Sequence, residues 1–164
     1  MPSDGSGRVR VRDLLPMLAL LPILLGSGGR ASPMNNPGPL DDTNQRYVTD
    51  LSDPDKSDRL YAARVLRSRL GVVLRDASRG RPGSMRQDEA FATLDDYETQ
   101  VAPACIDALA IRNVSHHCAA ILGMLAHDPA TEPLNALLAP EASSSRRARK
   151  QAIKALEAIQ AAAL

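Results

Sequence analysis

The side chains best suited to chemistry in this sequence are its two cysteines, Cys105 and Cys118. Each lies in an apolar stretch of helical periodicity, on either side of a turn near Arg112 and Asn113. An antiparallel helical hairpin would place the two sulfurs at similar heights, so that a disulfide is feasible and would stabilise the fold by about 3 kcal/mol. The other interpretation is a pair of free thiols packed as small apolar residues on inner helix faces. The spacing favours neither interpretation.

The three histidines do not have the spacing of a metal site. His116 and His117 are adjacent, so their side chains project about 100° apart on a helix. Metal-binding pairs on helices are four residues apart, and His127 is too distant to complete one. We interpret His116 and His117 as part of a solvated helix face. No nucleophile elbow or glycine-rich phosphate loop is present in the sequence, and we expect no enzyme, catalytic residue, metal or cofactor.

Charged residues are segregated in the middle of the chain. Between Arg59 and Arg86 there are eight arginines and one acidic residue, whereas five acidic residues and no basic ones lie between Asp88 and Glu98. The favoured interpretation is that these two segments form neighbouring helices whose charges pair. The functional interpretation is a basic ridge that docks an acidic partner. The candidate ridge residues are Arg59, Arg64, Arg67, Arg69 and Arg75.

Helices are the elements expected to position these groups. Hydrophobic residues make up 44% of the sequence and aromatic residues 2%, which favours small aliphatic side chains on closely packed helices over a sheet. Periodicity and capping residues predict helices over about 42–51, 57–70 with an extension toward 78, 85–112, 114–126, 128–139 and 146–162. Within 85–112, Pro103 predicts either a kink or a new helix start near Asp95-Asp96.

Three of these helices carry similar inner faces built from alanine and leucine. The copies are Ala62-Ala63-Val65-Leu66, Cys118-Ala119-Ile121-Leu122-Leu125 and Ala152-Ala155-Leu156-Ile159. A single such unit cannot bury its apolar stripe, so copies must stack into a continuous core. The sequence therefore predicts an all-α fold, a short α-solenoid of about three helical hairpins.

This pattern resembles the HEAT-like repeats first described in phycobilisome lyases. There, an apolar helix, an Asp-Pro-Asp-like turn and an arginine precede spaced alanines and a leucine. The matching residues are Leu51-Ser52-Asp53-Pro54-Asp55, Arg59, Ala62, Ala63 and Leu66; Ile106, Leu109, Arg112, Ala119, Leu122 and Gly123; and Pro133, Leu134, Leu138, Ala152, Ala155 and Leu156. The resemblance covers residues 42–162 except an interruption around 72–95, and it implies a HEAT-like binding platform.

The first residues have the three regions of a secretory signal peptide. Arg8, Arg10 and Arg12 precede the uncharged run from Leu14 to Leu25, which is shorter than the roughly 20 residues of a spanning helix and contains two prolines. We predict a signal peptide over 1–31, a flexible leader over 32–41 and a HEAT-like helical repeat domain over 42–164. Without residues 1–31 the chain has 16 basic and 17 acidic residues, which gives no general attraction to nucleic acid or membranes.

These inferences predict a non-catalytic scaffold or adaptor that binds another protein in the bacterial envelope, either in the periplasm or after secretion. No nucleic acid is expected as a partner, and no membrane insertion is expected after signal cleavage. The alternative is an enzyme accessory or lyase-like chaperone that holds a prosthetic group. A thiol-redox role for Cys105 and Cys118 is the third hypothesis.

Overall fold

The computed structural model of the protein describes residues 42–79 and 85–164, and every regular element in these ranges is a helix. The all-α prediction is therefore confirmed for them. The helices are α2 (Asp42–Asp50), α3 (Lys56–Arg79), α4 (Met85–Asp96), a π-helical turn η1 (Tyr97–Val101), α5 (Ala102–Ala108), α6 (Ser115–Met124), a 3-10 turn η2 (Asp128–Ala130), α7 (Thr131–Ala136) and α8 (Arg146–Ala162). The predicted signal peptide (1–31) and leader (32–41) lie outside the described residues. No helix in the described ranges is long and apolar enough to cross a membrane.

The long helix α3 forms the spine of the N-terminal half. It continues through Gly71 to Arg79, so the longer of its two predicted ends is the one observed. Its apolar side is buried from Ala62 through Leu70 to Ala77, and this burial outweighs the low helix propensity of one glycine. Part of the interruption predicted around 72–95 is therefore the end of α3, and α4 begins soon after it.

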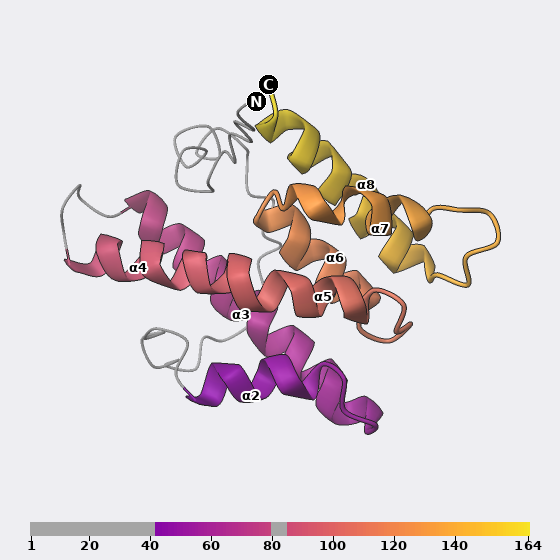
Figure 1. The fold of residues 1–164 in the computed structure, drawn as a ribbon, viewed down its shortest axis with the longest axis horizontal. Helices are drawn as coiled ribbons and strands as arrows, with labels where there is room; N and C mark the ends of the chain where they lie inside the picture. Colours follow the sequence, from indigo (N-terminus) through magenta and orange to yellow (C-terminus); the bar gives the residue numbers. More distant parts are fainter. Residues whose placement is uncertain (1–41, 80–84) are drawn as a thin grey trace, which may run out of the picture.

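One continuous helical segment runs through α4, η1 and α5 (Figure 1). The kink predicted at Pro103 takes the form of a π-turn just before it, closed by a hydrogen bond from the Ala102 N–H to the Tyr97 carbonyl. Proline has no N–H to donate, and its ring crowds the carbonyl four residues earlier. A wider turn immediately before Pro103 relieves this crowding without ending the helix. Tyr97 is buried and its hydroxyl donates to the Leu66 carbonyl at 2.9 Å, which ties η1 to α3.

The helices pack mainly on others that are near them in the sequence. α2 lies on α3, α3 also contacts α4 and α6, α5 contacts α6, and α7 packs on α8 (Figure 1). The most extensive pairing joins α6 to α8. Small residues allow this close approach, because a Cβ placed on Gly123 of α6 would lie 2.7 Å from the Cα of Ala155 in α8.

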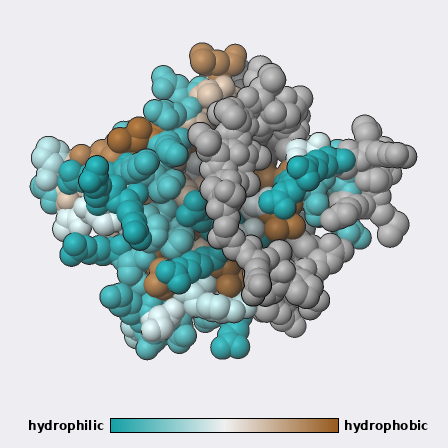
Figure 2. Space-filling model, turned by 180° about the vertical axis from the view of Figure 1, so that it is seen from behind, coloured by the Kyte–Doolittle hydropathy of each residue, from teal (hydrophilic) through white to brown (hydrophobic). Residues whose placement is uncertain are grey.

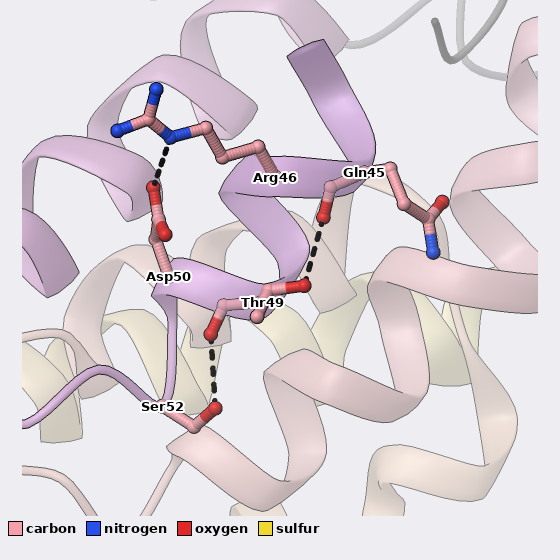
Figure 3. Close-up of polar contacts among 5 residues, drawn as sticks. All are labelled: Gln45, Arg46, Thr49, Asp50 and Ser52. Atoms are coloured by element: carbon pink, nitrogen blue, oxygen red, sulfur yellow. Dashed lines mark hydrogen bonds and ion pairs between the residues drawn. The ribbon is translucent and has the colours of Figure 1, made fainter. Parts of the chain in front are cut away.

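Helix α2 is short and its polar contacts are local. In α2 and the turn after it, the Thr49 hydroxyl donates to the Gln45 carbonyl, the Ser52 hydroxyl donates to the Thr49 carbonyl, and Arg46 pairs with Asp50 at 3.6 Å (Figure 3). An exposed pair of this kind contributes little to stability. The packing of α2 therefore depends on apolar contact with α3, to which Tyr47, Val48 and the buried Leu51 contribute.

Candidate functional site

The first residue of the predicted basic ridge, Arg59, is part of the turn between α2 and α3. Its Nη1 donates to the carbonyls of Asp53 and of Pro54, the latter at 2.9 Å. In the same turn the Asp55 carboxylate accepts the Ser57 N–H at 2.6 Å and begins α3. These backbone hydrogen bonds lower the pKa of Asp55. Arg59 is therefore a structural residue of this turn.

Arg149 has the same role in the loop before α8. Its Nε donates to the Ser144 hydroxyl at 3.0 Å, and its Nη2 donates to the Ala142 carbonyl at 3.1 Å. Ser144 in turn donates to the Leu137 carbonyl at 2.6 Å, and Ser145 caps α8 by accepting the Ala148 N–H. Arg149 thus stabilises the loop on which α8 begins.

Arg69, another residue of the predicted ridge, packs against aromatic side chains. Its guanidinium lies 5.5 Å from the centre of the Tyr47 ring, which is in edge contact with Tyr61. Of the predicted ridge residues, Arg59 and Arg69 therefore contact α2 and its turn, and Arg64, Arg67 and Arg75 share another side of α3. The reason is helical geometry, since Arg59 and Arg69 do not project from the same side of α3 as the other three.

The remaining arginines define a surface that we call the α3 face: Arg64, Arg67, Gly71 and Arg75. Arg64 and Arg75 are exposed and Arg67 is half-buried. A Cβ on Gly71 would meet no atom of the described residues within 4 Å, so none of them covers the helix there. Among the described residues, none of the three arginines has an ion-pair partner. The predicted pairing of this basic segment with the acidic one does not involve them.

Beside the α3 face lie two stacked imidazoles at the start of α6. The rings of His116 and His117 are 4.0 Å apart at their centres. His117 is only 9% exposed, and neither of its ring nitrogens has a hydrogen-bond partner in the described part of the protein. The predicted solvated helix face is therefore wrong for His117. A sequence signal existed, since His117 is three residues after Val114 and four before Ile121, on the apolar period of α6.

The electrostatic surroundings of both imidazoles are positive. Burial is the largest cause that lowers the pKa of His117, and together with His116, Arg67 and Arg64 it lowers this pKa to about 4. Burial likewise lowers the pKa of His116, with contributions from Arg67, Arg147 and Arg64. No acidic side chain is among the groups that shift either pKa. The two histidines and the three arginines that lower their pKa values come from α3, α6 and α8. We call these five residues the imidazole cluster: Arg64, Arg67, His116, His117 and Arg147.

The two cysteines lie together, as the hairpin between their helices suggests. Both are buried, both are free thiols in the structure, and they are hydrogen-bonded to each other. This hydrogen bond, together with burial, raises the pKa of Cys105. Reactive cysteines need a lowered pKa and access to solvent, whereas the pKa of Cys105 is raised and both thiols are buried. The disulfide and the pair of free thiols that the sequence leaves open both stay predictions.

A shallow pocket of about 400 Å³ lies between the α5–α6 turn and the loop before α8. Ile106, Leu109 and Leu137 provide apolar wall, and Arg112, Ser115 and Ser143 provide polar groups. In the described ranges no group of three or more His, Cys, Asp or Glu side chains is placed to hold a metal ion.

Comparison with known proteins finds no matching family model, no similar curated protein and no similar solved structure.

Proposed function

We propose that this protein is a non-catalytic scaffold or adaptor that binds another protein through the α3 face. The observation that carries the proposal is that Arg64, Arg67 and Arg75 have no ion-pair partner among the described residues, on a helix side where none of these residues would touch a Cβ on Gly71. An uncompensated basic surface favours acidic partners and speeds their association.

The rest of the surface supports a polar mode of binding. The large apolar side chains exposed in the described ranges are Tyr61, Ile153 and Leu164, which lie on separate segments. The face seen in Figure 2 is mostly hydrophilic where it is described, with apolar residues in small separate patches. Scattered apolar residues of this kind do not make a hydrophobic docking site.

As architecture for this scaffold we propose a short solenoid of HEAT-like hairpins. Packing between helices near in sequence supports it, and so do the two arginine-held turns. Arg59 and Arg149 each precede a buried alanine by three residues, Ala62 and Ala152. Stacked units with equivalent residues at equivalent places are the signature of repeat proteins.

We propose that the scaffold works in the bacterial envelope or outside the cell. The proposal is supported by the three regions of a signal peptide in residues 1–31. Intact mass of protein purified from its native host tests it. A mass that includes Leu14 to Leu25 would contradict it.

The binding function is tested by cross-linking the full chain in the envelope fraction of its host. We expect the wild type to capture one specific partner and the double variant Arg64→Glu/Arg75→Glu to lose it. The matched control is Lys150→Glu/Lys154→Glu, which changes the same charge at exposed positions of α8. Equal capture by all three proteins, or no specific partner, would contradict the proposal, and circular dichroism establishes that each variant is folded.

The second candidate, an accessory protein that holds a prosthetic group, is supported by the pocket beside Arg112. Its volume is within the range of small-molecule sites. The protein purified from its host would then have visible absorbance, and Leu109→Arg in the pocket wall would abolish it.

A further inference from the structure

We propose that the imidazole cluster binds a carboxylate side chain within an extended acidic segment of the partner protein. This inference rests on the proposed function, because it assigns the chemistry of the partner and adds a second contact beside the α3 face.

The first argument is the unpartnered imidazole of His117. A buried polar group without a hydrogen bond costs stability, and most such groups in folded proteins find a partner. His117 is nine-tenths buried and neither ring nitrogen has a partner among the described residues. A carboxylate oxygen would accept a hydrogen bond from its N–H and satisfy it.

The second argument is the sign of the surrounding charge. The groups that act on the imidazoles are Arg64 and Arg67 from α3 and Arg147 from α8. From α5, which also packs on α6, the acidic Asp107 is exposed and does not contribute to either pKa shift. Three guanidinium groups around two neutral imidazoles attract an anion, and arginine is the side chain best suited to hold a carboxylate.

The third argument selects an extended segment over a small anion. Arg64 and Arg75 are eleven residues apart on one helix, which is about 16 Å along its axis. An extended peptide of about five residues has this length. Gly71 lies between them without a side chain, and no described residue lies within 4 Å of where its Cβ would be, so a peptide backbone can approach the helix there. A segment of this length, seated at one end in the imidazole cluster, would reach Arg75 at the other.

Binding of a carboxylate has a spectroscopic consequence at His117. Its pKa, about 4 in the free protein, would rise because a neighbouring negative charge favours the imidazolium form. Proton uptake would then accompany binding, and the affinity would increase as the pH falls through the raised pKa of the complex toward the free value of about 4.

The test is a titration of the full chain with the peptide hexaglutamate, with hexaglutamine as control, followed by the NMR signals of both histidines and by calorimetry. We expect hexaglutamate to raise the pKa of His117 above about 5 and hexaglutamine to leave it unchanged. The double variant Arg64→Ala/Arg67→Ala should bind at least about ten-fold more weakly. Lys154→Ala, an exposed residue of α8, should bind like the wild type.

Three outcomes would overturn the inference. The first is no change in the pKa of either histidine, and the second is equal binding of hexaglutamate by the wild type and by Arg64→Ala/Arg67→Ala. The third is that inorganic phosphate shifts the pKa of His117 as much as hexaglutamate does and binds as tightly. The last would indicate a site for small anions. If hexaglutamate does not bind but the envelope partner is still captured through the α3 face, this inference fails and the proposed function stands. If no partner is captured at all, the proposed function fails whatever the peptide does.

Discussion

The contact between α6 and α8 and the outer face of α3 contain the same residue type in opposite surroundings. Gly123 lies where α6 touches the backbone of α8, and an added Cβ would be 2.7 Å from the Cα of Ala155. Gly71 lies mid-helix in α3, where an added Cβ would meet nothing within 4 Å in the part of the chain that the structure describes. The first glycine is required by close packing. The second weakens its helix without a packing benefit from any described residue.

The two regions differ in how closely their side chains are packed and in whether their charges are paired. Between α6 and α8 the side chains are small, buried and closely packed, as in Ala119, Ala152 and Ala155. Along the α3 face the side chains are long, charged and unpaired among the described residues. Close packing between α6 and α8 stabilises the fold, and the charges of the α3 face are the basis of the binding function proposed above.

The largest expected effect is at the core of the packed region. Leu122 is fully buried in α6, so Leu122→Ala should lower the free energy of unfolding by about 2–5 kcal/mol. Glu157→Ala, on the exposed side of α8, should stay within about 0.5 kcal/mol. Denaturant titrations measure both. Leu156, which the sequence pattern suggests is equally buried, is only partly buried, and its replacement by alanine should cost less than that of Leu122.

The next effect separates the two glycines. Gly123→Ala forces α6 away from α8 and should lower the free energy of unfolding by about 1–3 kcal/mol. The clash is with backbone atoms, which a side-chain rotation does not relieve. Thermal unfolding of the variant provides the measurement, and an unchanged midpoint would show that the two helices are not in close contact.

Gly71→Ala should act in the opposite direction. With free space around the new methyl group, it should raise the free energy of unfolding by about 0.5–1 kcal/mol through helix propensity. The same variant should weaken partner capture if a peptide backbone passes over this position. A destabilised Gly71→Ala would instead mean that another part of the chain covers the α3 face.

The smallest effect distinguishes the starts of α3 and α8. The cap of α3 is the Asp55 carboxylate, whose pKa is lowered by the Ser57 and Asp58 amides, whereas the cap of α8 is the Ser145 hydroxyl. A lowered pKa in the folded state means that the stabilisation is present above the ordinary aspartate pKa, near 4, and is lost as the pH falls through the lower folded value. The protection factor of the Ser57 amide against hydrogen exchange should therefore decrease in acid, whereas that of the Ala148 amide should be retained.

Much of the helical structure could be predicted from local signals. The bounds of α8 follow from a serine cap and alanine-leucine periodicity, and the disturbance near Pro103 follows from proline geometry. Three features could not be predicted in this way. The division of the arginines depends on which side of α3 each one projects from, the burial of His117 depends on two other helices, and the continuation of α3 through Gly71 depends on tertiary burial that outweighs helix propensity.

The π-turn at Tyr97–Val101 allows one continuous helical segment to pack against two neighbouring helices. Relative to an uninterrupted α-helix, a turn with one additional residue delays the direction of every later side chain by about 100°. The segment before it can face α3 while the segment after it faces α6, and no loop is needed between them. The π-turn thus rotates the side-chain directions of α5 about the helix axis relative to those of α4. Deleting one residue within it would rotate Cys105 relative to Leu94, and would separate the cysteine pair without altering either cysteine.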